Sequence, residues 1–243
     1  MTTQTMTAAV LPPSKAVTFD QLWHFAKVVA AELTVAKSMA KSTANRLTIN
    51  SASAHSTDTQ TYPTPESVFQ SIGLRLERPE RCWTYYCTPR NAKTFASTGR
   101  DGVHYSFLVS KELRHSPIVM TVPMSFETPN IVIAETLHEF LCLGCRTSYL
   151  LLESLTMDEN DFHPLTLKGY SAQLSQEQRY HLQRLTQRFS LAPYVALRQR
   201  IACLQTKYID YLQMGEVERT SKKTAMQKTA MPAAFTFGQF LRS

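Results

Sequence analysis

The segment 93–109 constrains the fold most, because two strand-like runs meet at a bend that has glycine at both ends. Residues 93–98 lead into the sequence GRDG at 99–102, and apolar side chains then alternate with polar ones through 103–109. Glycine adopts the positive backbone φ that a tight turn between strands requires. The segment therefore predicts a β-hairpin.

Three further short runs around this hairpin are typical of strands. They are the aromatic run CWTYYC at 82–87, PIVMTVP at 117–123 and NIVIA at 130–134. The connections are too short for the helical crossovers that parallel strands need. We therefore expect an antiparallel sheet of four to six strands between about residues 80 and 134.

Helical periodicity appears on both sides of this region. Thr18 and Gln21 have the spacing of a capping box, and so do Ser175 and Gln178, so each pair predicts the start of a helix. Apolar residues also recur along one helical face from 135 to 155. The predicted fold class is α+β, with the sheet flanked by N-terminal and C-terminal helices.

The chain has 243 residues, of which 43% are hydrophobic, and this suits one compact core. We divide it by composition and periodicity into a disordered N-terminus at 1–15, an N-terminal helix at 16–49, a polar loop at 50–64, an α+β core with C-terminal helices at 65–214, and a basic tail at 215–243.

The sequence predicts a soluble, cytosolic protein without a membrane partner. Its apolar runs stay below the roughly 18 residues that a membrane-spanning helix needs. The first residues lack the basic start and apolar block of a secretory signal. The five cysteines are an odd number in a large chain, which favours reduced thiols.

The cysteines do not have the pattern of a zinc site. Cys142 and Cys145 form a CxxC, but it lies within a helical pattern and not in the tight turn that aims two thiolates at one ion. Cys82 and Cys87 are five residues apart, so a strand would direct them to opposite faces. Phosphate-loop, dinucleotide-binding and nucleophile-elbow sequences are also missing. We predict no metal, no cofactor and no catalytic residues.

The bend at the centre of the hairpin offers a candidate binding edge. Arg100, Asp101 and His104 are polar side chains at or beside a turn, and Trp83 and Tyr86 precede it as aromatic anchors for a protein partner. A second interpretation pairs Asp101 with His104 as the acid–base couple of a small hydrolase-like enzyme. A third assigns the turn a purely structural role.

The C-terminal third suggests a different partner. Residues 164–243 contain 12 of the 26 basic residues and four of the 19 acidic ones, within a net charge of +7. Arg184, Arg188, Arg198 and Arg200 would follow the phosphates of a nucleic acid. A solvated basic helical face explains the same charges without a partner.

The stretches TPRNAKTFASTGRDGVHYSFL, SPIVMTVPMSF and NIVIAETLHEFLCLGC resemble an uncharacterised family of bacterial cytosolic proteins, over roughly residues 83–155. More distantly, the chain is similar to SUKH-type proteins, although it lacks their N-terminal tryptophan-and-glycine signature. Many SUKH-type proteins are immunity proteins, which bind and neutralise toxins. The resemblance implies a curved antiparallel sheet with flanking helices and a binding scaffold without catalysis.

The leading expectation is thus a non-catalytic, immunity-like module that binds another protein. Nucleic-acid binding through residues 164–243 and hydrolase-like catalysis by Asp101 and His104 are the two alternatives.

Overall fold

The computed structural model describes residues 16–47, 62–81, 85–156, 173–194 and 197–215. The predicted disordered N-terminus, the basic tail from residue 216 and most of the polar loop lie outside these residues.

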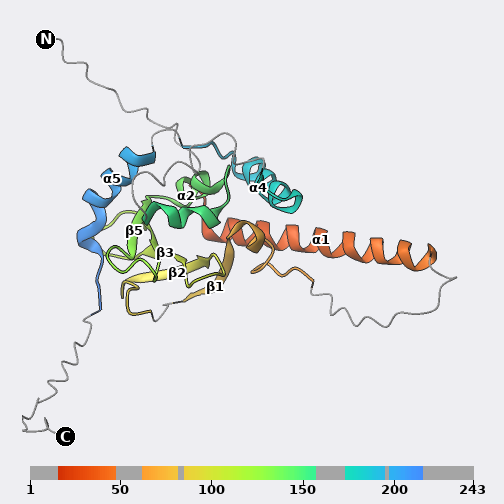
Figure 1. The fold of residues 1–243 in the computed structure, drawn as a ribbon, viewed down its shortest axis with the longest axis horizontal. Coiled ribbons are helices and arrows are strands. Elements are labelled where there is room, and N and C mark those ends of the chain that lie inside the picture. The colour runs from red at the N-terminus through yellow and green to blue at the C-terminus, as the bar shows by residue number, and fades with distance from the viewer. Residues whose placement is uncertain (1–15, 48–61, 82–84, 157–172, 195–196, 216–243) are drawn as a thin grey trace, which may run out of the picture.

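Five strands form one antiparallel sheet in which each strand pairs with the next along the chain (Figure 1). They are β1 (Arg75–Arg81), β2 (Ala92–Ser97), β3 (His104–Leu108), β4 (Ile118–Thr121) and β5 (Asn130–Ala134). His104 lies opposite both Ser97 and Thr121, and Thr121 lies opposite Asn130. The predicted hairpin, the antiparallel sheet and the α+β fold class are confirmed.

The first strand differs from the prediction. Residues 85–87 form a turn where we expected a strand, and β1 instead has the sequence RLERPER at 75–81. Beyond Leu76 this run lacks the apolar alternation by which a strand is recognised in a sequence. The strand β1 lies at the edge of the sheet, where polar residues are tolerated. Charges and a proline suit such an edge, since they discourage pairing with another sheet.

Helices cover one face of the sheet. They are α1 (Phe19–Leu47), α2 (Leu137–Gly144) and α4 (Gln176–Phe189), with the short turns η1 (Gln70–Ile72) and η2 (Tyr149–Thr156) between them. Figure 1 shows α2 and α4 on the same side of β1 and β2, and Phe19 of α1 lies edge-on to Phe95 and Phe107 of this face. Aromatic rings fill the layer between sheet and helices. Phe95 stacks on Phe107 with 4.3 Å between ring centroids, and Phe140 of α2 lies 4.8 Å from Tyr105. This aromatic layer is the centre of the core.

Both predicted capping boxes are present. The Thr18 backbone N–H donates to Gln21 Oε1 at 3.0 Å, and the Gln21 N–H donates to Thr18 Oγ1 at 3.3 Å. Ser175 and Gln178 make the same reciprocal pair at the start of α4. Each box satisfies two N–H groups that a helix start leaves unpaired.

The apolar face predicted from 135 to 155 is buried, but it does not belong to one continuous helix. Helix α2 ends at Gly144, and η2 begins after Ser148, whose φ is +84°. A Cβ at Gly144 would lie 2.4 Å from the Tyr149 ring, so glycine allows the chain to fold back here. The Tyr149 hydroxyl then donates to the Leu141 carbonyl at 2.8 Å, which satisfies an acceptor near the helix end.

The opposite edge of the sheet is covered by α5 (Leu197–Tyr208), which continues into η5 (Ile209–Tyr211). The Gln205 amide bonds the backbone of Val132 in β5, donating to its carbonyl at 2.7 Å and accepting from its N–H at 3.3 Å. A side chain thus replaces part of the missing neighbour strand. This contact protects β5 from pairing with another chain.

A charged cluster attaches α5 to the start of α2. Arg200 bonds Glu139 and Glu135 at 2.6 Å each, and Lys207 and Tyr208 each donate to Glu135 at 2.6 Å. Burial alone raises the pKa of Glu135, but hydrogen bonds from Lys207, Tyr208 and Arg200 outweigh it and lower the pKa to about 2. Glu139 is 9% exposed, and the Arg200 guanidinium is its ion-pair partner.

We predict that Arg200→Met lowers the free energy of unfolding by about 2–3 kcal/mol at pH 7, because it leaves a buried carboxylate without its cation. Lys207→Met is the matched control: Lys207 is 61% exposed, so its loss costs below about 1 kcal/mol. Urea unfolding measures both losses, and equal losses in the two variants would contradict this account.

The charged cluster also makes the stability depend on pH. The stabilisation by ionised Glu135 is present above its unfolded pKa of about 4.5 and is lost as the pH falls toward 2.

Candidate functional site

The second face of the sheet carries polar side chains that are nevertheless buried. Thr94 and Ser106 share a hydrogen bond at 2.9 Å, and the Thr121 hydroxyl donates to Asn130 Oδ1 at 2.8 Å. Segment 85–91, which we call the strap, lies over this face. The Asn130 amide donates to the Cys87 carbonyl of the strap at 2.7 Å.

His104 is the second attachment point of the strap. Its Nδ1 lies 2.8 Å from the Gly102 carbonyl oxygen, and its Nε2 lies 3.2 Å from Thr88 Oγ1. Because a carbonyl only accepts, Nδ1 carries the proton and Nε2 accepts the Thr88 hydroxyl. The Tyr85 ring stacks on the imidazole at 5.8 Å. Burial lowers the pKa of His104, and the bond to Gly102 opposes this in part.

The predicted exposed edge is therefore wrong with respect to His104, which is fully buried, whereas Asp101 is exposed. The alternation along β3 directs His104 to the polar face, and the strap covers it there. Both ring nitrogens are already engaged inside the protein. The hydrolase-like alternative thereby loses its base, because an enclosed imidazole cannot exchange a proton with a substrate at the turn.

Five large apolar side chains are exposed where three segments of the chain meet, and we call them the aromatic patch. They are Tyr85 and Tyr86 of the strap, Met124 and Phe126 of the β4–β5 loop, and Met214 after η5. The Tyr86 hydroxyl donates to the Pro123 carbonyl at 3.2 Å. The Asn130 amide, which also bonds the strap, lies 3.6 Å from the Met214 sulfur. These contacts place the three segments side by side.

The loop that carries Met124 and Phe126 is held closed at its base. The Val122 N–H donates to the Pro129 carbonyl at 2.7 Å, and the Ser125 N–H donates to the Val122 carbonyl at 3.0 Å. Phe126 is 77% exposed and Met124 is 66% exposed. The loop thus presents two apolar side chains to water on a closed base.

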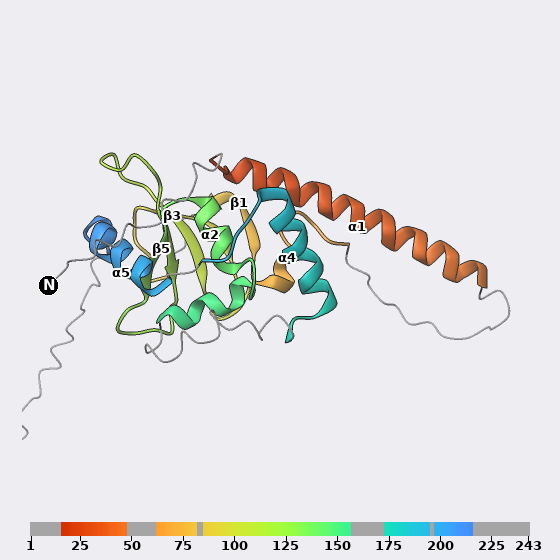
Figure 2. The same ribbon diagram turned by 90° about the horizontal axis from the view of Figure 1, so that it is seen from above.

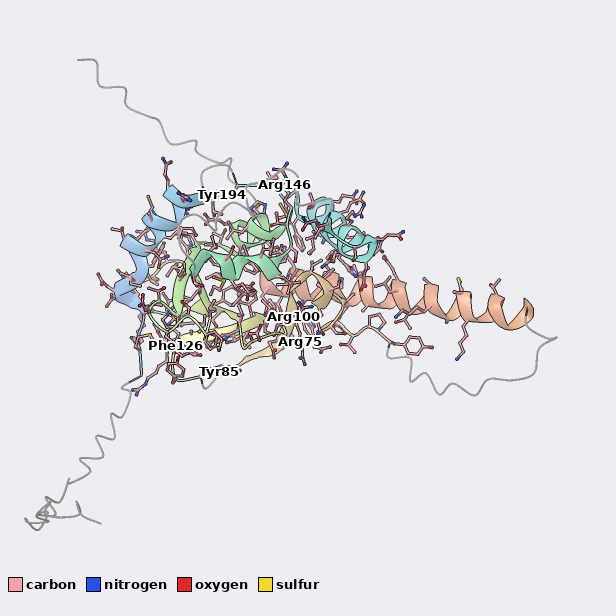
Figure 3. The ribbon with its side chains drawn as sticks, viewed as in Figure 1. Arg75, Tyr85, Arg100, Phe126, Arg146 and Tyr194 are labelled. Atoms are coloured by element: carbon pink, nitrogen blue, oxygen red, sulfur yellow. The ribbon has the colours of Figure 1, made fainter. Side chains whose placement is uncertain are left out.

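The turn between β2 and β3 adjoins the patch. Gly102 has φ +70°, and a Cβ there would lie 2.8 Å from the Tyr85 hydroxyl oxygen and 3.2 Å from Pro123 Cγ. Glycine at this position lets the turn approach the strap and the β4–β5 loop. Figure 3 shows Tyr85, Phe126 and Arg100 on the sheet side of the body, away from Arg146 and Tyr194 on the helical side.

Charged side chains border the patch. Arg100 and Asp101 are exposed on the turn, and Arg90 is exposed at the end of the strap, beside Gly215. Burial and the neighbouring Asp101 raise the pKa of Glu153, while Arg100 lowers it, so the turn lies close to η2. The surface has an apolar centre and a charged rim.

The structure brings together some of the predicted site residues. Tyr86 lies in the patch, Arg100 and Asp101 lie at its rim, and Trp83 lies outside the described residues. Sequence reasoning missed Met124 and Phe126. Their signal is the loop sequence PMSFETP, in which apolar side chains stand between two prolines with no strand or helix to bury them.

The four arginines of the nucleic-acid alternative do not form one surface. Arg184 and Arg188 lie on α4, and Arg198 and Arg200 lie on α5, at opposite sides of the body in both Figure 1 and Figure 2. Arg184 pairs with Glu32 at 2.8 Å, and Arg200 is held in the charged cluster. The structure does not bring the four arginines together, and nucleic-acid binding stays a prediction.

Cys142 and Cys145 are buried, and burial raises the pKa of both thiols. Within the described ranges, no three His, Cys, Asp or Glu side chains gather closely enough to hold a metal ion. Among the helices described, none has the length and apolar character to cross a membrane.

Comparison of the chain with known protein families, with curated proteins and with solved structures found no match.

We predict that the pKa of His104 lies below 6.5 and that the neutral ring carries its proton on Nδ1, both of which ¹⁵N NMR of the imidazole measures directly. Below pH 6.5 the unfolded chain protonates His104 more readily than the folded chain does, so the free energy of unfolding falls as the pH drops from about 7 to about 5. His104→Gln removes part of this fall. The remaining part comes from His181, because burial lowers the pKa of His181 as well. An imidazole that titrates at or above 6.5 would contradict the burial of His104.

Proposed function

We propose that this chain is a non-catalytic protein-binding module of the cytosol that neutralises a toxin in the manner of an immunity protein. In this proposal the partner contacts the aromatic patch and the adjoining turn. The observation that carries it is that three segments lie side by side on the surface and that each of them exposes large apolar side chains.

The composition of the patch favours a protein partner. Tyrosine, phenylalanine and methionine are enriched at the centres of protein interfaces, where burying one such side chain contributes about 1.5–3 kcal/mol. Methionine adapts its shape to a partner, and tyrosine adds a hydroxyl that can bond at the rim. Arg90, Arg100 and Asp101 supply the charged rim that is typical of such interfaces.

The strap supports this use of the surface because it is fixed before any partner arrives. The Thr88 hydroxyl donates to His104, the Asn130 amide donates to the Cys87 carbonyl, and the Tyr86 hydroxyl donates to the β4–β5 loop. A patch that is already ordered loses little conformational entropy on binding. The immunity role itself rests on the more distant resemblance of the chain to SUKH-type proteins.

We predict that the full chain captures a protein partner from the lysate of its native host, and that Tyr86→Ser with Phe126→Ser weakens the capture at least about tenfold. The loss follows because the two removed anchors together contribute about 1.4 kcal/mol or more. Both side chains are largely exposed, so the melting temperature changes little. Quantitative mass spectrometry of the captured proteins provides the measurement.

Tyr62→Ser is the matched control, since Tyr62 is an exposed aromatic residue that precedes η1 and belongs to none of the three segments of the patch. It leaves capture unchanged. Expression of the captured protein alone inhibits growth, and coexpression of the wild-type chain restores it. Capture that survives the double substitution would overturn the patch, and a harmless partner would overturn the immunity role. Capture lost on nuclease treatment would favour nucleic acid instead.

A further inference from the structure

The second half of α1 extends away from the folded body in both Figure 1 and Figure 2. Residues 35–43 are all exposed, whereas Leu22, Ala26 and Val29 of the first half are buried in the core. Thr34, Val35 and Ser38 are weaker helix formers than alanine or leucine. A helical segment of this length is marginal in water without packing partners.

One face of this half is apolar. Val28 and Val35 are 40% and 52% exposed, and Met39 is 66% exposed. Together with Ala31 they recur at the three- and four-residue spacing of a helical stripe. The surface of this stripe is open and only slightly hollowed, and it is formed by Ala31, Glu32, Val35, Ala36 and Met39.

The polar side chains near the stripe do not obstruct an apolar contact. The Thr34 hydroxyl donates to the Ala30 carbonyl at 2.8 Å, and the Ser38 hydroxyl donates to the Val35 carbonyl at 2.8 Å. Since these hydroxyls are already bonded to the helix backbone, covering them costs little. The side chains are also small, so a second helix can approach closely.

The charges of α1 are unbalanced in favour of cations. Its two acidic residues are engaged from outside the helix, Asp20 by Arg78 at 3.1 Å and Glu32 by Arg184 at 2.8 Å. Lys27, Lys37 and Lys41 are exposed and make no ion pair with any residue that the structure describes.

At about 100° per residue, Lys27 lies on one flank of the stripe and Lys41, 14 residues further along, lies farther round the same side of α1. On the other flank Arg184 of α4 is paired with Glu32. The unpaired cations near the stripe are therefore on one side of it.

We propose that the stripe Val28–Ala31–Val35–Met39 of α1 is a docking site for an amphipathic helix of a partner protein that carries acidic residues beside its apolar face. Apolar anchors of the partner lie along the stripe, and its carboxylates meet Lys27 and Lys41. This surface is separate from the aromatic patch and does not depend on the function proposed for it.

Two other occupants fit the surface less well. A second copy of the chain would bring lysines of one α1 toward lysines of the other, because the acidic residues of α1 are already paired. A lipid surface is usually bound by helices with tryptophan, phenylalanine or leucine on the apolar face. This stripe has valine, alanine and methionine instead.

The test is a selection with a phage-displayed library of amphipathic helices about three heptads long. Leucine is fixed at the apolar positions, and the flanking positions are randomised among Glu, Lys, Gln and Ser. The full chain is the target. We expect the selected helices to be rich in Glu at the flanks, and their affinity to fall as salt increases.

Val35→Glu with Met39→Glu weakens the selected helices at least about tenfold, and Lys27→Gln with Lys41→Gln weakens them and reduces the salt dependence. Lys37→Gln with Ala40→Glu is the control, because it changes the net charge equally on the opposite side of α1 and leaves affinity nearly unchanged. Far-UV circular dichroism checks that each variant keeps its helices. Selection of no helix, or of neutral or basic flanks, would overturn the proposal.

Two further measurements address the other occupants. If the wild-type chain sediments as a dimer, and Val35→Glu with Met39→Glu dissociates it, the stripe binds a second copy and the proposal is overturned. If the chain binds vesicles of anionic phosphatidylglycerol, and the same substitutions abolish this binding, the stripe binds a lipid surface and the proposal is again overturned. A monomer that does not bind the vesicles supports the helix partner.

Discussion

The hydrogen bonds that hold the strap on the polar face of the sheet determine what this protein shows to its surroundings. His104 and Asn130 reach from β3 and β5 to Thr88 and the Cys87 carbonyl, and these contacts replace the second helical layer that many sheets of this kind have. A buried polar layer is stable only when its members are paired with one another. Here the pairing holds the seven residues of the strap, which form neither helix nor strand, and the exposed Tyr85 and Tyr86 are among them.

The two faces of the sheet therefore have different roles in one molecule. The helical face is an aromatic core built around Phe95, Tyr105 and Phe140, and it supplies stability. The strap face supplies position, because it brings the β4–β5 loop and the end of η5 against the strap to form the aromatic patch. Both edges of the sheet are protected against pairing with another molecule. Charges and a proline protect β1, and α5 covers β5. Contacts with other molecules are therefore expected on surfaces other than the sheet edges.

The sequence was sufficient for the parts of the fold that follow a local rule. The capping boxes, the glycine-flanked hairpin and the alternation of 130–134 each depend on residues close together in the chain. It failed where distant contacts decide. The strand at 75–81 is defined by pairing with β2, and the break after Gly144 exists because Tyr149 packs against it. The burial of His104 depends on the strap, whose path no periodicity encodes, and for this reason the candidate site was predicted only in part.

Site-specific photocrosslinking in living cells tests the central claim, that the strap and the β4–β5 loop together form a surface that meets another protein. A benzoylphenylalanine introduced at position 126 or position 86 reports any protein within contact distance of the patch, and the same residue at position 62 reports the surface before η1. The account predicts one shared crosslinked species from positions 126 and 86 and none from position 62. Unrelated crosslinks from 126 and 86, or the same species from all three positions, would contradict it.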